Sequence, residues 1–284
     1  MTSSLVGSEM CIRDRDSVAS IGEYAFYGCT SLTEITIPDS VSSIGDSAFY
    51  SCTSLTEVTI PNGVTNIEGF VFTNTPWLIA KQEENPLVII NGTLIDGTTC
   101  TGSVTIPDSV TSIAGGAFDS CTGLTAITIP ESVTSIGDSA FYRCTGLTEI
   151  AIPESVTSIG NYAFDSCTNL TKITIPDSIT SISDYAFRGC TGLKTITIPE
   201  SVTTVGENAF SGCTGLTEIT IPNSVVDIGE SAFENCTNLT IYGYFGSAAE
   251  TSAAENKISF VSIGGVQTTE PVATTTTELV TTTT

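Results

Sequence analysis

The chain has 284 residues, of which 31 are acidic, 8 are basic and none is histidine, so the formal net charge is −23. This balance argues against a nucleic-acid partner and against docking on anionic lipid, because both need clustered lysine and arginine. The absence of histidine removes the Ser–His and Cys–His catalytic pairs and every imidazole metal ligand. No apolar run reaches the ~18 residues that a membrane-spanning helix needs, so we expect no membrane insertion.

Residues 1–15 match no position of the repeat that follows them. They hold two of the four arginines and lack the long apolar core of a signal peptide. We interpret them as a non-native scar, which would make the chain a fragment; a poorly ordered native arm is the alternative. On either interpretation, the first repeat unit is expected to present an open edge.

A period of 23 residues runs from Asp16 to about Phe245 and gives ten consecutive units. The well-matched units share the pattern x-S-V-T-S-I-G-x-x-A-F-x-x-C-T-x-L-T-x-I-T-I-P, in which positions 3, 6, 10, 11, 14, 17, 20 and 22 are apolar. These units begin at Asp16, Asp39, Asp108, Glu131, Glu154, Asp177, Glu200 and Asn223.

Each unit predicts a strand, a shorter extended stretch and a turn. The alternation in Leu-x-x-Ile-x-Ile is typical of a half-buried strand, which the following proline ends. The spacing of Ala-Phe-x-x-Cys favours one helical turn with an inward face. Because one unit cannot bury eight apolar side chains alone, we expect the units to stack into one core. The predicted fold is a β-rich α/β repeat solenoid, with a parallel β-sheet on one face and short helical turns on the other.

The segment 75–107 departs from the regular unit. Residues 76–84 predict a short helix, because Pro76 suits a first helical position and Asn85-Pro86 stops it. Asn91-Gly92 lies between two apolar runs, which favours a hairpin with a type I′ turn. Lys81 stands where the repeat has isoleucine, so we expect the regular strand to be lost in this unit.

Residues 240–263 predict a C-terminal cap over the last apolar unit. Ser247 and Glu250 have the spacing of a helical capping box, residues 248–255 favour a helix, and residues 258–263 favour a final strand. Residues 264–284 are rich in threonine, which predicts a disordered linker.

The repeated elements I-P-x-S-V-T-S-I-G and A-F-x-x-C-T-x-L resemble the BspA-like leucine-rich repeat family. The resemblance covers roughly 230 of the 284 residues, and segments 75–107 and 240–263 are similar to variants that recur in that family. It implies a secreted or cell-surface protein of a bacterium or protist. It also implies a non-enzymatic adhesion or interaction scaffold for protein or glycan partners on host or microbial surfaces.

Eight of the ten cysteines share position 14 of the unit. In-register side chains that all point inward fit disulfide geometry poorly and do not surround a metal, so we expect buried free thiols. Cys11 and Cys100 lie off this column, and we expect them to be more exposed. The column consists of Cys29, Cys52, Cys121, Cys144, Cys167, Cys190, Cys213 and Cys236.

Acidic residues recur at positions 1, 8 and 19. Stacked carboxylates are a candidate calcium site, but the sequence has no glycine-rich aspartate loop, so a solvated acidic rim is the favoured interpretation. Repeated columns offer no unique carboxylate pair for acid–base chemistry. We therefore predict no enzyme activity, no metal site and no cofactor.

The outward strand positions 19 and 21 are the candidate binding face, although threonine is also simply favoured on exposed strands. The leading hypothesis is a monomeric interaction scaffold that uses this face and the irregular unit. The alternative is a structural spacer that displays a module beyond the threonine-rich linker. Tyrosines at positions 9 and 12 are either partner anchors or packing between units, and Trp77 is expected to plug the local core. The predicted binding residues are Glu34, Thr36, Glu57, Thr59, Thr128, Glu149, Lys172, Thr174, Thr195, Thr197, Glu218 and Thr220.

Overall fold

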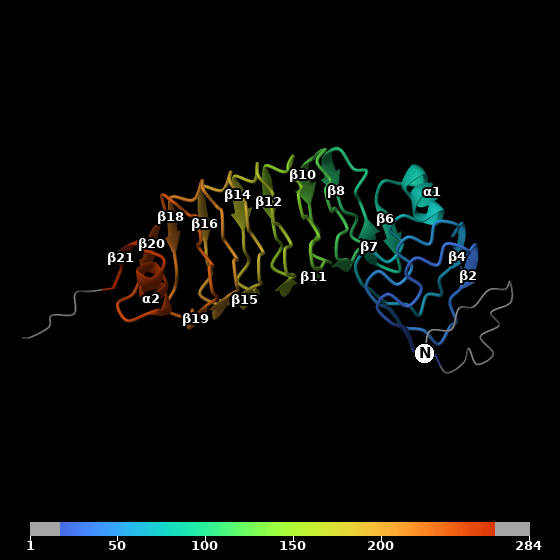
Figure 1. Cartoon of the computed structure of the whole chain (residues 1–284), viewed down its shortest axis with the longest axis horizontal. Helices are drawn as coiled ribbons and strands as arrows, with labels where there is room; N and C mark the ends of the chain where they lie inside the picture. The colour runs from blue at the N-terminus through green and yellow to red at the C-terminus, as the bar shows by residue number, and fades with distance from the viewer. Residues whose placement is uncertain (1–17, 265–284) are drawn as a thin grey trace, which may run out of the picture.

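The computed structural model describes residues 18–264. In Figure 1 the chain runs from right to left as a ladder of stacked repeat units. We use the word rung for one repeat unit. The interpretations placed on residues 1–15, on Cys11 and on residues 265–284 lie outside the described residues. Within residues 18–264, no helix is long and apolar enough to cross a membrane.

Before the C-terminal end, one face of the solenoid carries one of the predicted parallel strands in every rung except the third. The 23-residue period sets their register, so Ile127 pairs with Ile150 and Ile150 with Ile173. Isoleucine therefore lies beside isoleucine along the inward side. The strands are β2 (Glu34–Thr36), β4 (Glu57–Thr59), β8 (Gly102–Thr105), β10 (Leu124–Thr128), β12 (Glu149–Ala151), β14 (Lys172–Thr174), β16 (Thr195–Thr197) and β18 (Glu218–Thr220).

A second row of two-residue parallel strands follows the prolines, as the Val-x-x-Ile pattern predicts. Repeated hydroxyls tie this row together: Ser155 Oγ donates to the carbonyl of Val133 at 2.7 Å, one rung away. The strands are β1 (Ser20–Ile21), β3 (Ser43–Ile44), β5 (Asn66–Ile67), β9 (Ser112–Ile113), β11 (Ser135–Ile136), β13 (Ser158–Ile159), β15 (Ser181–Ile182), β17 (Thr204–Val205) and β19 (Asp227–Ile228).

The turn portion of each regular rung is built from tight turns, and the expected helical turn is not what forms. Positions 9 and 13 have positive φ, as at Tyr162 (57°) and Ser166 (61°), which a right-handed helix does not allow. Backbone donors then alternate in direction. Cys167 N–H donates to Phe164 of its own rung at 3.2 Å, whereas Phe164 N–H donates to Ala186 of the next rung at 2.8 Å. The backbone thus bonds between rungs on this side as well.

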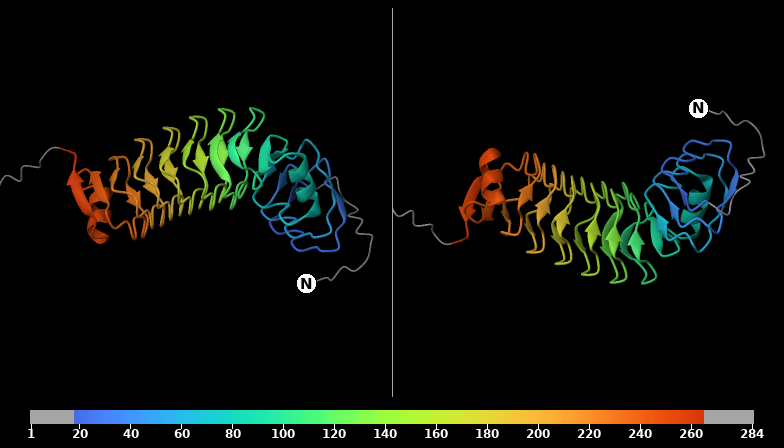
Figure 2. Two further views of the ribbon diagram at one scale, coloured as in Figure 1. Left: turned by 90° about the horizontal axis from the view of Figure 1, so that it is seen from above. Right: turned by 90° about the horizontal axis from the view of Figure 1, so that it is seen from below.

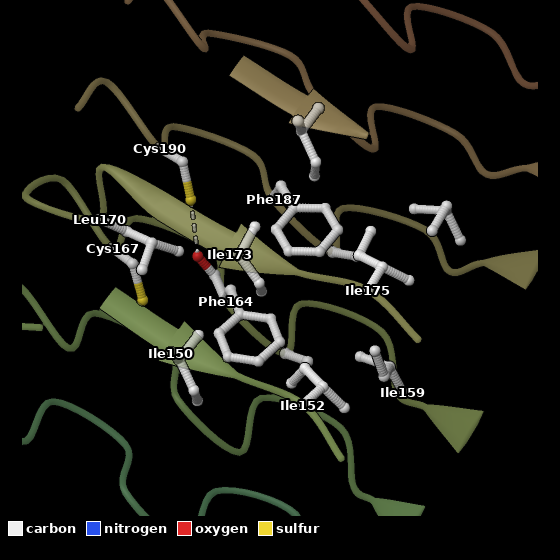
Figure 3. Close-up of a cluster of buried hydrophobic side chains, with 14 of the residues drawn as sticks. Ile150, Ile152, Ile159, Phe164, Cys167, Leu170, Ile173, Ile175, Phe187 and Cys190 are labelled. Carbon is white, nitrogen blue, oxygen red and sulfur yellow. Dashed lines mark hydrogen bonds between the residues drawn. The ribbon is translucent and has the colours of Figure 1, made fainter. Parts of the chain in front are cut away.

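Rings and thiols stacked in register form the core between the two faces (Figure 3). The ring of Phe164 lies 5.2 Å from that of Phe141 and 5.5 Å from that of Phe187, both nearly parallel to it. The Cys190 Sγ–H donates to the carbonyl of Phe164 at 3.1 Å, and this contact recurs along the column. Each rung therefore contributes one ring and one thiol that contact the rung before it.

Helix α1 (Pro76–Glu84) takes the place of a strand in the third rung, with the bounds that the sequence predicts. Thr75 caps it, because the Thr75 Oγ1 accepts a bond from Leu78 N–H at 3.1 Å. Trp77 is 8% exposed, and its ring lies 4.5 Å from that of Phe72, so it plugs the core as expected.

The predicted hairpin follows α1 as the antiparallel strands β6 (Val88–Ile90) and β7 (Thr93–Asp96). Asn91 (φ 47°) and Gly92 (φ 84°) both have the positive φ of a type I′ turn. β7 then pairs in parallel with β9 and returns the chain to the ladder.

The phenylalanine stack is interrupted at this hairpin, because Gly97 stands where a regular rung has phenylalanine. A Cβ at Gly97 would overlap the ring of Phe118. The buried residues accordingly form two clusters, one built around Phe49 and Phe72 and the other running from Leu94 to Ala253. Figures 1 and 2 show the first rungs turned out of line with the rest of the ladder at this point.

The C-terminal end is closed by β20 (Thr240–Gly243), helix α2 (Ala248–Glu255) and β21 (Ser259–Ser262). β21 pairs in parallel with β20, which extends the sheet one strand beyond the ten units. Ser247 caps α2 as predicted, but the Glu250 carboxylate accepts from Gly246 N–H at 2.7 Å rather than from Ser247 N–H. Gly243 lets the helix approach, since a Cβ there would lie 2.8 Å from that of Ala249.

Candidate functional site

All twelve residues predicted for the binding face are exposed and lie on the long strands. Their side chains alternate with buried ones: in β14, Lys172 and Thr174 are exposed on either side of buried Ile173. Because the strands are parallel and in register, positions 19 and 21 form two columns on the outer side of the sheet.

The structure divides these residues into two groups. Four lie on the paired strands β2 and β4, and eight lie on β10 to β18, which belong to two hydrogen-bonded sheets that adjoin between β14 and β16. Helix α1 replaces the strand of the rung between the groups, and the ladder changes direction there (Figure 2). The candidate face is therefore a long surface on β10–β18 and a separate short one on β2–β4.

The columns continue over residues that the sequence reasoning did not select. Thr105 is the register partner of Thr128, and the 23-residue phase was a sufficient signal for it. Tyr242 pairs with Thr220, and Val261 pairs with Tyr242. The spacings of these last two are 22 and 19 residues, so a period of 23 could not reveal them.

Side-chain charge varies along position 19, whereas the residue at position 21 is nearly constant. Glu149 and Lys172 are register partners, so opposite charges lie on adjacent strands. Position 21 is threonine on most strands, including Thr174 and Thr197. Chemical differences along the face therefore come mainly from position 19.

The cysteine column consists of free thiols, and burial makes most of them unreactive. Burial raises the pKa of Cys167 to about 12 and of Cys236 to about 11, which keeps both thiols protonated. Two expectations were wrong. Cys29 is exposed, because it lies in the first rung of the described ladder, and Cys100 is buried, because the hairpin returns it to the column. The Cys121 Sγ lies 3.1 Å from the Cys100 carbonyl.

Several acidic residues at position 8 satisfy backbone donors of the neighbouring rung. The Asp138 carboxylate accepts from Asn161 N–H at 2.8 Å, and the Asp184 carboxylate accepts from Glu207 N–H at 2.8 Å. These residues hold adjacent turns together at the solvated edge. Across residues 18–264, no three Cys, Asp or Glu side chains are arranged to hold a metal ion.

The tyrosines on the turn side pack against neighbouring rungs. The rings of Tyr162 and Tyr185 are stacked at 4.6 Å, and the Arg188 guanidinium lies 5.6 and 5.1 Å from their centroids. Arg188 also forms an ion pair of 2.6 Å with Asp165, a fully buried carboxylate. Packing between rungs, the favoured interpretation of these tyrosines, accounts for this cluster.

A solenoid with a parallel sheet on one side and turns on the other, built on repeated Leu-x-x-Ile-x-Ile strands, is a leucine-rich repeat protein. The model of the BspA type leucine-rich repeat region, in six copies, matches residues 12–125, 89–183 and 157–251, and the chain belongs to this family. Leucine-rich repeats present extended binding surfaces, so membership suggests a protein-interaction scaffold. Such repeat families are typically non-enzymatic.

Solved structures similar to this chain include three bacterial leucine-rich repeat proteins. A leucine-rich cell surface protein from Faecalibacterium prausnitzii is 29% identical, with 83% of this chain and 85% of that chain covered and a TM-score of 0.35. A leucine-rich repeat protein from Bacteroides ovatus is 23% identical, with 87% of this chain and 88% of that chain covered and a TM-score of 0.40. A leucine-rich repeat protein from Eubacterium ventriosum is 23% identical, with 78% of this chain and 84% of that chain covered and a TM-score of 0.47. No curated protein matches the chain.

Proposed function

We propose that the chain is a monomeric, extracellular or cell-surface adhesion scaffold that binds a protein or glycan partner through the long surface on β10–β18. The observation that carries this proposal is the alternation of the strands. Every inward side chain of β12 and β14 is buried in the core, while Glu149, Lys172 and Thr174 are exposed in register. An in-register array of this kind presents polar groups at regular spacing to a large partner.

Charge reversal at position 19 tests the proposal. Glu149→Lys and Glu218→Lys change two exposed residues of the face, and Glu154→Lys is the matched control, because Glu154 is exposed but lies off the strands. We expect the two face variants to lose capture of surface proteins from host or microbial extracts, or of glycans on an array, and the control to retain it.

Unchanged capture by both face variants would exclude this face as the binding site. It would favour the alternative role, a spacer that displays a module attached elsewhere. Sedimentation of the purified chain tests the monomer, and an oligomer that buries β10–β18 would also contradict the proposal.

A further inference from the structure

A cavity of about 570 Å³ lies beside α1, where the ladder changes direction. Residues from six segments line it: the turns of the first three rungs, α1, the hairpin and the turn of the fifth rung. Its volume falls within the ~300–1,000 Å³ that is typical of ligand pockets. It lies on the turn side, so it is distinct from the strand face proposed above.

A buried carboxylate lines this cavity. Asp96 is 6% exposed, and its Oδ1 accepts bonds from the Gln82 side-chain amide at 2.8 Å and from Thr98 N–H at 3.2 Å. The Thr98 hydroxyl lies 3.1 Å from Oδ1 and 3.2 Å from Oδ2, and its single proton cannot serve both. Oδ2 therefore keeps acceptor capacity. Burial raises the pKa of Asp96, which means that the free charge is poorly compensated.

The field in the cavity is negative. Asp46 and Asp119 also line it, and the lining contains no lysine or arginine. Burial raises the pKa of Asp46, and the nearby carboxylates of Glu23, Glu68 and Asp138 raise it further. An anionic ligand would be repelled here, whereas a cation would gain from every one of these carboxylates.

Aromatic rings supply the rest of the recognition chemistry. Tyr24, Tyr50 and Phe70 line the cavity, and the Phe70 ring lies against Gly116, where a Cβ would overlap it. Ring faces attract ammonium and guanidinium groups, and carboxylates bind the same groups through charge-assisted hydrogen bonds. We propose that this cavity binds a lysine or arginine side chain of a partner protein. This inference rests on the proposed function as an interaction scaffold and places a second contact on its turn side.

Titration of the full chain with Nα-acetyl-L-arginine methylamide and its lysine counterpart, followed by calorimetry or NMR, tests the proposal. The citrulline counterpart of the arginine probe has the same shape without the charge. We expect the two cationic probes to bind and the citrulline probe to bind at least about tenfold more weakly, since each ~1.4 kcal/mol of charge-assisted bonding is a factor of ten.

Variants place the binding in the cavity. Asp119→Asn and Asp46→Asn change partly exposed residues and should each weaken binding about fivefold or more. Glu234→Gln is the matched control, because Glu234 is the exposed equivalent of Asp119 in a regular rung. Asp96→Asn should have a larger effect than Asp119→Asn, and the two partly exposed positions test the cavity independently of the buried one.

No binding of either cationic probe at millimolar concentration, equal binding of the citrulline probe, or unchanged binding by Asp119→Asn would overturn the proposal. Preferential binding of a neutral methyl glycoside would overturn it in favour of a sugar site. The strand-face variant Glu149→Lys should leave probe binding unchanged. Loss of capture in that variant therefore reports on the proposed function, and loss of probe binding in Asp119→Asn reports on the cavity.

Discussion

Phe164→Ala should destabilise the long C-terminal core and leave the N-terminal core unaffected. The Phe164 side chain is fully buried, with one ring stacked on each side at 5.2 and 5.5 Å. Truncation of a buried phenylalanine costs about 3–5 kcal/mol, and a stacked pair contributes about 0.5–1.5 kcal/mol beyond its buried area. With two such pairs lost, we expect a loss near the upper end, about 4–5 kcal/mol.

The matched variant is Phe49→Ala in the other core. Phe49 is equally buried and is stacked between Phe26 at 5.1 Å and Phe72 at 5.4 Å. Because Trp77 is the single tryptophan and contacts Phe72, its fluorescence reports on the N-terminal core, whereas far-UV circular dichroism reports on the whole ladder. Urea denaturation followed by both signals separates the two effects.

We expect Phe164→Ala to shift the main circular dichroism transition and to leave the Trp77 midpoint in place, and Phe49→Ala to shift the Trp77 midpoint. The physical reason is that rungs contact only their neighbours and that Gly97 interrupts the phenylalanine stack between the clusters. Equal shifts of both signals in Phe164→Ala would refute the division into two cores, and a loss below about 1.5 kcal/mol would refute the stacking argument.

Three further predictions follow from burial. Alkylation of native protein should label Cys29 rapidly, whereas Cys100 and the other described column thiols should react only on unfolding; rapid labelling of Cys167 would contradict the buried column. Deletion of residues 240–263 should expose the last rung and cause aggregation, and a soluble, monomeric truncation, measured by light scattering, would show that this segment is not a cap. Asp96→Asn should raise the free energy of unfolding at neutral pH. Because burial raises the pKa of Asp96 in the folded chain, the protonated carboxyl contributes stability below its ordinary pKa of 3.8, and this contribution is lost as pH rises through the raised pKa. The urea midpoints of Asp96→Asn and of the unchanged chain should converge in acid. A difference in midpoint that stays constant between pH 3 and pH 7 would contradict this pH dependence.

The period of 23 was enough to predict the strand faces, because a side chain repeated in register has one environment in every rung. Val133, Ile136 and Leu147 are buried for the same reason that Val156, Ile159 and Leu170 are. The exposure of the twelve strand-face residues followed from the same alternation. The local signals at Pro76 and at Asn91-Gly92 were also sufficient, since they depend on backbone preferences within a few residues.

The backbone conformation on the turn side could not be predicted from the period. Ala-Phe-x-x-Cys has a spacing that a helix and a series of tight turns both satisfy, and the bonds between rungs favour the second. Phe164 N–H donates to Ala186 of the next rung, a bond that a helix would replace with one inside its own rung. The positive φ of Tyr162 is a result of that stacking, because nothing in its own sequence neighbourhood requires it.

The sequence by itself determined the solenoid, the inward and outward sides of its sheet and the two irregular segments, because each depends on a periodicity or a short turn signal. The tertiary structure alone decided where the ladder bends, which strand-face residues share a surface, and that Cys100 rejoins the core. It also decided that Asp46, Asp96 and Asp119, from three different rungs, line one cavity with Tyr50 and Phe70. Such groupings depend on how α1 and the hairpin displace whole rungs, and no repeat position encodes that displacement.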